Sequence, residues 1–183
     1  MTLSHPTSSA LSVAVLPIVI APDPRLKQKC KSVTSFDAVL RDLIDAMMAT
    51  MYAQDGYGLA APQIGNLQRL MVIDPSPRGA KRTPYFFVNP EITWRSPESE
   101  TRDEGCLSLP DIYVPVTRAR AVKLSYLDDK GKNQTLEAEG MFARIIQHET
   151  DHLDGILHVD YLSSLKRNMI LRKLTKLKKL DLV

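Results

Sequence analysis

Apolar residues spaced three or four positions apart predict three helices in this chain. The first is expected over Phe36–Gln54, with Ser35 as its N-cap and Gly56 at its end. Its apolar face consists of Leu40, Leu43, Ile44, Met47 and Met51. A second helix is expected after Gly140, and a third over 162–183, where apolar residues recur at spacings of three to five and form a stripe.

Short runs of β-branched and aromatic residues predict strands between these helices. The run that ends at Leu127 alternates apolar and polar side chains, as a strand with one solvated face does. The expected strands are Val13–Ile20, Arg69–Asp74, Tyr85–Asn89, Ala121–Leu127 and Gln134–Ala138. Asp128–Gly131 supplies a hairpin turn between the last two. The pattern predicts an α+β fold, with short, mostly antiparallel strands packed around a central helix and an amphipathic helix at the C-terminus.

Length and composition are those of one globular domain. The chain has 183 residues, of which 44% are apolar and 25% are charged, and domains commonly contain roughly 100–200 residues. No repeat, low-complexity tract or linker divides the chain. We therefore expect a single domain over 1–183, taken below as one catalytic domain, with a loose polar tail over residues 1–10.

The cysteines and the N-terminal sequence indicate the compartment. Two cysteines, Cys30 and Cys106, are too few for a disulfide scaffold and favour a reducing environment. The apolar run Ala10–Ala21 follows no Lys or Arg, contains Pro17 and is too short to cross a bilayer. It is thus neither a signal peptide nor a membrane span, and we expect a cytoplasmic protein without membrane contact.

The most specific chemical signal is the sequence H-E-T-D-H over His148–His152. On a helix, its two imidazoles lie four residues apart on one face and can bind one divalent metal, with Glu149 beside the first of them. A water activated by such a metal attacks carbonyl carbons near neutral pH. The motif predicts a metal-dependent hydrolase whose central helix binds the metal. A chance match on a polar helix face is the alternative.

Helical spacing places Met141 and Ile145 on the same face as His148 and His152. The two apolar residues either belong to the core or form a pocket wall beside the metal, for a flexible apolar side chain of a substrate. The sequence leaves both interpretations open, and they overlap because a pocket wall is also packed from behind.

A catalytic metal needs a third protein ligand and one open position, and the sequence offers two candidates. Cys106 lies in the segment E-G-C-L-S-L-P over Glu104–Pro110, although a lone buried cysteine is more often a small hydrophobic residue. His158 completes the pattern H-E-x-x-H-x-x-G-x-x-H, with Gly155 in place, and this is the three-histidine pattern of metzincin peptidases. Taken alone, the longer pattern favours His158.

A glycine-rich loop, G-Y-G-L-A-A-P-Q over Gly56–Gln63, precedes the metal motifs. Its small residues allow the backbone to approach another group closely, although the same loop also serves as a turn that closes the first helix. Beside a metal-activated nucleophile, the side-chain amide of Gln63 is a suitable donor for a developing oxyanion.

Three segments together resemble the motifs of the peptide deformylase family, which are G-x-G-x-A-A-x-Q, E-G-C-L-S and Q-H-E-x-D-H. They stand here at Gly56–Gln63, Glu104–Ser108 and Gln147–His152, in the same order and at similar separations. The likeness runs from about Val15 to the tail. Three motifs in register are far more specific than the H-E-x-x-H pattern alone.

The resemblance implies an enzyme that removes the formyl group from the N-terminal formyl-methionine of nascent bacterial or organellar proteins. The metal ligands that it implies are Cys106, His148 and His152. It further implies that Glu149 transfers protons, and that Gln63 and the backbone N–H of Leu107 stabilise the oxyanion. Iron(II) is the implied metal, one per chain, and zinc, nickel or cobalt also suit a thiolate with two imidazoles. The residues expected to bind the formyl-peptide substrate, partly through an added strand, are Tyr57, Gly58, Gly105, Met141 and Ile145.

Three residues depart from the pattern expected of the family: His158 stands where a large apolar residue is expected, and Arg102 and Arg144 stand where an apolar pocket lining is natural. Two alternatives remain open at this point. One is a metzincin-like peptidase with His158 as third ligand, and the other is a non-catalytic, ribosome-associated metal-binding module. Glu149 and Gln63 favour an enzyme, because a binding module needs no general base.

Positive charge is concentrated in the tail. Seven basic residues and one acidic residue give 163–183 a net charge of +6, and because the whole chain carries +3, the remainder carries −3. A cationic amphipathic helix usually packs on its own domain with a solvated charged face. Nascent chains emerge from ribosomes, whose surface is largely RNA phosphate, so we expect this basic helix (162–183) to contact the ribosome, and we expect no binding to DNA.

Overall fold

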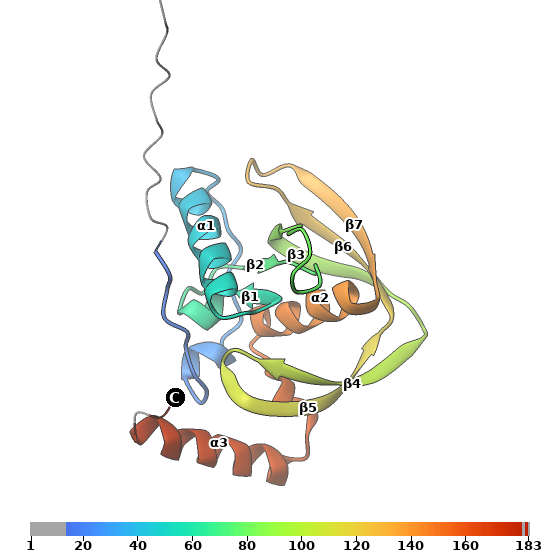
Figure 1. Ribbon diagram of the computed structural model, residues 1–183. Coiled ribbons are helices and arrows are strands. Elements are labelled where there is room, and N and C mark those ends of the chain that lie inside the picture. The colour runs from blue at the N-terminus through green and yellow to red at the C-terminus, as the bar shows by residue number, and fades with distance from the viewer. Residues whose placement is uncertain (1–13, 181, 183) are drawn as a thin grey trace, which may run out of the picture.

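The computed structural model describes residues 14–180 and 182 and shows an α+β fold (Figure 1). Antiparallel pairing joins five strands in the order β1-β2-β3-β6-β7, and β4 and β5 pair as a separate two-stranded sheet. The strands are β1 Gly58–Ala60, β2 Leu70–Ile73, β3 Tyr85–Arg95, β4 Ser99–Cys106, β5 Leu109–Ala119, β6 Ala121–Leu127 and β7 Asn133–Glu139. The predicted fold class is confirmed.

Three α-helices occur in the part of the chain that the structure describes. They are α1 Ala38–Ala53, α2 Gly140–Leu153 and α3 Ser164–Lys179. Short 3₁₀ helices cover Pro24–Lys27, Ala61–Ile64 and His158–Tyr161. As predicted, the helix that carries the two histidines of the metal motif is central, since α2 lies between the five-stranded sheet and the β4–β5 hairpin (Figure 1).

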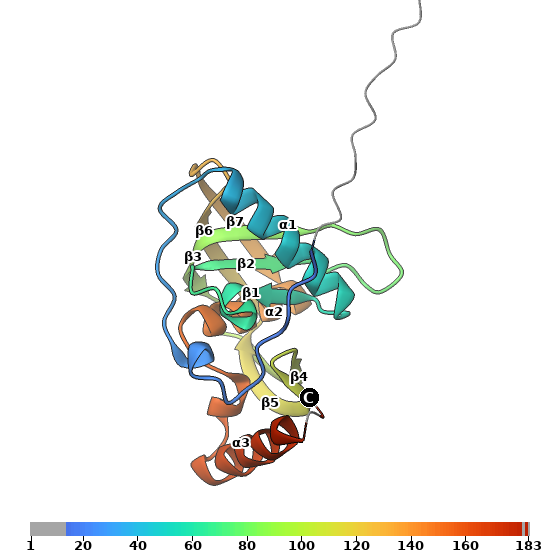
Figure 2. The ribbon, with the colours of Figure 1, turned by 90° about the vertical axis from the view of Figure 1, so that its left-hand side faces the viewer.

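The five-stranded sheet is covered on both faces by helices. Leu70 and Val72 pack in one apolar cluster with α1, whereas Met71 and Ile73 pack in another cluster with Ile146 of α2. Successive side chains of a strand point to opposite faces, so all four residues of β2 are buried. Figure 2 shows α1 and α2 on opposite sides of this sheet. The sheet thus gives α2 a rigid apolar support.

The β6–β7 hairpin forms as the sequence predicts. β6 has the predicted bounds, and β7 extends the predicted strand Gln134–Ala138 by one residue at each end. The N–H of Gly131 donates to the carbonyl of Asp128 at 3.1 Å, and Gly131 has a positive φ of 74° that suits glycine in a tight turn.

Two of the differences from the predicted boundaries have a local physical cause. α1 begins at Ala38 rather than Phe36, because its N-cap is Asp37 and not Ser35: the Asp37 carboxylate accepts the N–H of Leu40 at 3.1 Å. β3 continues beyond Asn89 to Arg95, because a β-bulge accommodates Pro90, which has no N–H to donate to the ladder.

The strand predicted over Val13–Ile20 is wrong for the described residues 14–20, which form no strand. This segment is held by bonds outside any sheet, since Leu16 donates its N–H to Thr50 Oγ1 at 2.9 Å and Val19 donates to the carbonyl of Gln63 at 2.7 Å. Val13 and the predicted tail over residues 1–10 lie outside the described residues.

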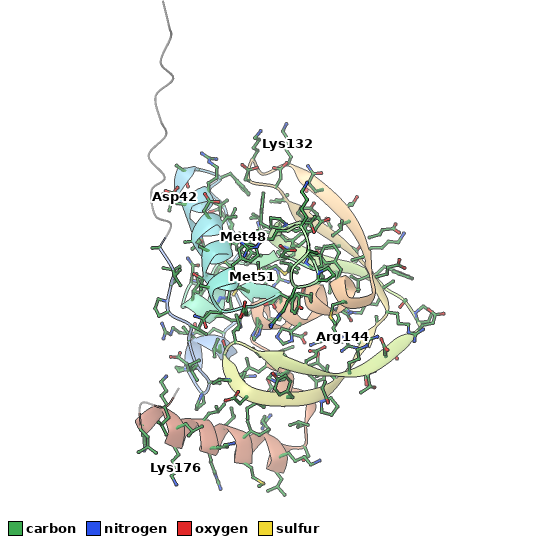
Figure 3. All side chains as sticks on the ribbon, in the orientation of Figure 1. Asp42, Met48, Met51, Lys132, Arg144 and Lys176 are labelled. Atoms are coloured by element: carbon green, nitrogen blue, oxygen red, sulfur yellow. The ribbon has the colours of Figure 1, made fainter. Side chains whose placement is uncertain are left out.

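The basic tail forms α3, but its apolar stripe does not face one surface as predicted. Leu174 is fully buried, whereas Leu165 and Met169 are 71% and 63% exposed. Figure 3 shows Lys176 pointing away from the rest of the molecule. α3 is therefore held by one side and presents basic and apolar groups on the other. Within residues 14–180 and 182, no helix has the length and apolar character needed to cross a membrane.

Candidate metal centre and active site

Three metal-ligating side chains converge where the end of β4 meets α2. The ligand atoms of Cys106, His148 and His152 all lie within 4.8 Å of one another, and Sγ of Cys106 is 3.2 Å from Nε2 of His152. The two histidines lie about one turn apart on α2, as their spacing requires. A thiol with two imidazoles is a donor set that fits zinc and neighbouring divalent metals.

The two histidine rings differ in how readily they are protonated. Burial lowers the pKa of His152 well below 6.5, so this ring stays neutral and able to coordinate. Burial also acts to lower the pKa of His148, but the bonds from Cys106 and Glu104 outweigh it and raise that pKa well above 6.5. A metal ion therefore competes with a proton for His148.

Glu149 lies buried beside the ligands and is only 4% exposed. Its Oε2 has no hydrogen-bond partner among the described residues, and burial raises its pKa to about 7. Such a carboxylate is suited to moving protons near neutral pH. Gly58 provides the space for it, because a Cβ at position 58 would lie 2.8 Å from Cδ of Glu149.

Gln63 points its amide nitrogen toward the same group. Its Oε1 accepts the N–H of Ala60 at 2.8 Å, which fixes the orientation of the amide. Its Nε2 then lies 3.6 Å from Sγ of Cys106 and 3.3 Å from Oγ of Ser108. The structure thus brings Gln63 to the ligands with its donor end facing them, and Leu107 follows Cys106 directly in the chain.

Glu104 belongs to the site, although the sequence predicts no role for it beyond its place in the E-G-C-L-S motif. Its Oε2 accepts Nδ1–H of His148 at 2.9 Å, and because a carboxylate only accepts, Nε2 of His148 is left free for a metal. Arg118 donates to both carboxylate oxygens, at 3.0 and 2.9 Å. Burial acts to raise the pKa of Glu104, but the bonds from His148 and Arg118 outweigh it and hold that pKa well below 4.5.

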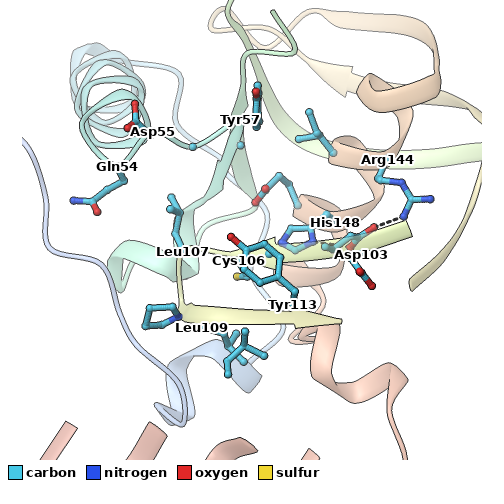
Figure 4. A pocket seen from close by; sticks show the side chains of 18 of the residues that line it. Gln54, Asp55, Tyr57, Asp103, Cys106, Leu107, Leu109, Tyr113, Arg144 and His148 are labelled. Atoms are coloured by element: carbon cyan, nitrogen blue, oxygen red, sulfur yellow. Dashed lines mark hydrogen bonds and ion pairs between the residues drawn. The ribbon is translucent and has the colours of Figure 1, made fainter. Parts of the chain in front are cut away.

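A cavity of about 550 Å³ opens onto these groups (Figure 4). Its walls include all five residues expected to bind the substrate, which are Tyr57, Gly58, Gly105, Met141 and Ile145. Ile145 is 7% exposed and also part of the core, whereas Met141 is 49% exposed. Ile145 is therefore both a core residue and part of the cavity wall, whereas Met141 belongs to the wall alone.

Tyr113 of β5 lines the cavity and was not predicted. It is 72% exposed, and its ring covers Gly105, where a Cβ would lie 3.0 Å from the ring. Tyr113, Cys106 and His148 line the same cavity (Figure 4). The sequence signal that identifies it is weak, because the alternation of Val114 and Val116 with polar residues in β5 is interrupted by Pro115.

His158 lies outside the group of ligands. Its Nε2 donates to the carbonyl of Ile112 at 3.3 Å, and its ring centroid is 6.0 Å from that of His148. Burial lowers its pKa to about 4. His158 thus packs as a neutral ring behind the site, and the metzincin alternative with His158 as third ligand is not supported.

An α+β fold in which a strand end and a helix bring a thiol, two imidazoles and a buried carboxylate to one cavity defines a metal-dependent hydrolase. The sequence model of one family, described as polypeptide deformylase, matches residues 15–168. The chain belongs to the polypeptide deformylase family, whose members are hydrolases of protein biosynthesis that remove N-terminal formyl groups.

Individual relatives agree with this assignment over nearly the whole chain. The peptide deformylase of Rhizobium meliloti is 46% identical over 164 residues, covering 90% of this chain and 94% of the relative. That of Rickettsia prowazekii is 51% identical over 171 residues, covering 91% and 98%. The crystal structure of a peptide deformylase from Legionella pneumophila has a TM-score of 0.83 at 45% identity, covering 92% of this chain and 98% of that one. The deformylase of Ehrlichia chaffeensis has a TM-score of 0.86 at 36% identity, covering 93% and 100%.

Proposed function

We propose that Cys106, His148 and His152 hold one divalent metal, and that the site removes the formyl group from the formyl-methionine of nascent polypeptides and releases formate. The observation that carries this proposal is the convergence of three ligand atoms beside the buried carboxylate of Glu149 in a single cavity. Iron(II) is the proposed native metal, and zinc(II), nickel(II) and cobalt(II) suit the same ligands. When bound, the metal supplies a Lewis acid and lowers the pKa of water.

Glu149 moves the protons of the reaction in this proposal. It accepts a proton from the attacking water and then delivers it to the leaving amine of methionine, for which a pKa near 7 is suitable. The side-chain amide of Gln63 and the backbone N–H of Leu107 donate to the oxygen of the formyl group as it becomes negative. The bond from Gln63 Oε1 to Ala60 supports this role, because it fixes the donor before the substrate arrives.

Recognition depends on the methionine side chain and the peptide backbone, because a formyl group is too small to supply much binding energy. Met141 and Ile145 offer an apolar wall to the side chain. Gly58 lies in β1, which is an edge strand of the five-stranded sheet, and Gly105 lies in β4. The peptide backbone pairs with these two segments as an added strand, with Tyr57 at the side of the cavity.

Formate release from a formyl-Met peptide by the metal-loaded protein tests this proposal, with the acetyl-Met peptide as a matched substrate control. Glu149→Gln keeps the size of the side chain but removes the proton acceptor. We expect it to retain metal and to lose activity by ~10²–10⁴-fold. Absence of formate with the unaltered protein, or equal turnover by Glu149→Gln, contradicts the proposal.

The proposed setting is the ribosome. We propose that residues 1–183 act as one catalytic domain in the cytoplasm, and that α3 contacts ribosomal RNA phosphates without reading sequence. The exposure of the basic side chains of α3, such as Lys176 (Figure 3), supports this contact. Contacts with DNA or a membrane are not part of the proposal.

A further inference from the structure

Arg144 has no part in the proposed chemistry, although it lines the catalytic cavity. It lies on α2 one turn before His148, at a position where an apolar wall is natural. Its side chain is 8% exposed, and Figure 4 shows the guanidinium directed away from Cys106. The methylene stem therefore contributes to the cavity wall, while the charged end is bonded elsewhere.

Three acceptors on the β4–β5 hairpin hold this guanidinium. Nη1 of Arg144 donates to Oε1 of Glu104 at 2.6 Å and to the carbonyl of Val116 at 3.0 Å. Nη2 donates to the carbonyl of Glu100 at 2.6 Å. Two of these acceptors are backbone atoms, one on each strand of the hairpin. Arg144 thus fixes the hairpin backbone relative to α2, as well as the carboxylate that orients His148.

Arg118 cannot replace Arg144 in this arrangement. Arg118 lies on β5, so its bidentate bond with Glu104 joins two residues of the same hairpin. It reaches α2 through Asp151 at 2.6 Å, beyond His148 along the helix. Arg144 instead joins Glu104 directly to the turn of α2 that precedes His148, so that Glu104 is bonded to both Arg144 and His148 on one helix face.

We propose that Arg144 is a positioning residue, which sets the orientation of the His148 ring and the place of Cys106 by tying Glu104 and the hairpin backbone to α2. This inference rests on the proposed function, because it takes His148 and Cys106 to be metal ligands. Since Cys106 is the last residue of β4, a shift of the hairpin moves the thiol relative to the two histidines.

Cobalt(II) binding tests the inference independently of turnover. Arg144→Leu keeps an apolar stem and removes the guanidinium. We expect the cobalt(II) affinity, measured by competition with a chelator, to fall by ~10–100-fold, as for other residues that orient metal ligands. We also expect a changed visible spectrum of the bound cobalt(II), and a lower kcat for a formyl-Met peptide with KM nearly unchanged.

Two matched variants separate positioning from charge and from stability. Arg102→Leu removes the same charge from the same cavity, but Arg102 pairs with Glu100 and not with Glu104. Arg69→Leu removes a guanidinium bonded to the carbonyl of Pro90 and to the carboxylate of Asp154, and neither of these groups is bonded to the side chain of a proposed ligand. We expect both variants to keep the cobalt(II) affinity and spectrum of the unaltered protein, even where Arg69→Leu lowers the melting temperature.

Arg144→Lys covers the case in which Arg144→Leu does not fold. An ammonium group cannot reach all three acceptors on two strands, so we expect an intermediate affinity and a changed spectrum. Unaltered affinity and spectrum in a folded variant of Arg144 would show that this residue is only structural. Failure of the unaltered protein to bind cobalt(II) would instead overturn the proposed function.

Discussion

Cys106 and His158 are the two candidates that the sequence offers for the third metal ligand, and they differ in what each contacts in the structure. The thiol of Cys106 lies with the two histidines, whereas His158 is bonded to a carbonyl group. We expect Cys106→Ala to lose most of its metal and activity, and His158→Ala to keep its metal. Metal content of the two purified variants measures this, and metal retained by Cys106→Ala but lost from His158→Ala would reverse the assignment.

His158 makes the stability of the fold depend on pH. Burial lowers its pKa from 6.5 to about 4, so between these values the unfolded state binds a proton that the folded state does not. The stability that comes with the neutral ring is fully present above pH 6.5. As the pH falls toward 4, the free energy of unfolding decreases by about 3 kcal/mol because of this histidine. Urea denaturation of the metal-free protein at both pH values should show a smaller loss for His158→Phe. Equal losses in the two proteins contradict the shift.

Gly58 is required by the carboxylate that it contacts. A Cβ at this position would lie 2.8 Å from Cδ of Glu149, so Gly58→Ala must displace Glu149 from its buried place. We expect metal content to remain normal and kcat to fall by at least tenfold, since a misplaced proton-transfer group loses much of its effect. Gly79→Ala, at a loop position where a Cβ meets nothing within 4 Å but φ is +82°, is the control for an added methyl group together with backbone strain far from Glu149, and we expect it to keep a normal kcat. Normal kcat in Gly58→Ala would mean that Glu149 adapts.

The helices and strands in which apolar and polar residues alternate with a regular period were predictable from the sequence. α1, α2 and the β6–β7 hairpin each bury one regular face or have a defined turn, and their errors are confined to a cap and to strand ends. The β4–β5 hairpin was not predictable. Most residues of β4 are exposed and polar, and β5 contains Pro110 and Pro115. The motifs locate Cys106, but the partners of Glu104 depend on how this hairpin packs, so they could not be inferred.

α3 carries the proposed ribosome contact, and its packing determines how this contact is tested. Removal of the helix would expose the core around Leu174, which is fully buried. Reversing the charge of three exposed residues, Arg172, Lys173 and Lys176 to Glu, leaves that core intact. We expect the charge-reversed variant to co-sediment more weakly with ribosomes and to hydrolyse short formyl-Met peptides as fast as the unaltered protein. Co-sedimentation of the unaltered protein should also decrease more steeply with salt concentration than that of the variant.

The matched control reverses three exposed lysines on loops distant in sequence from α3, which are Lys81, Lys130 and Lys132. It produces the same change in net charge, so it should leave ribosome binding largely intact if the contact belongs to α3. Equal weakening by both sets of substitutions would assign binding to net charge and not to this helix.

At the scale of the whole molecule, the site joins the five-stranded sheet and the β4–β5 hairpin, each of which packs against its own apolar cluster. The five-stranded sheet has helices on both faces, while β5 of the hairpin packs in a third apolar cluster with Leu26, Leu157 and Leu174. Between these parts lie the three proposed metal ligands and the bonds of Glu104 and Arg144. The motifs predicted that Cys106, His148 and His152 meet here, but neither the bonds of Glu104 and Arg144 nor the joining of two sheets.

This junction has a consequence for the exchange of backbone amides with solvent. A metal ion held by both Cys106 of the β4–β5 hairpin and the histidines of α2 binds only when the hairpin is packed against the helix. It therefore suppresses openings in which the hairpin separates from α2. On removal of the metal by a chelator, we expect deuterium uptake to accelerate in Ser99–Ala119, while β2, buried on both faces, exchanges as slowly as before. Mass spectrometry of the two forms measures this difference, and uniform acceleration throughout the chain would mean that the metal stabilises the whole fold and not the attachment of one hairpin.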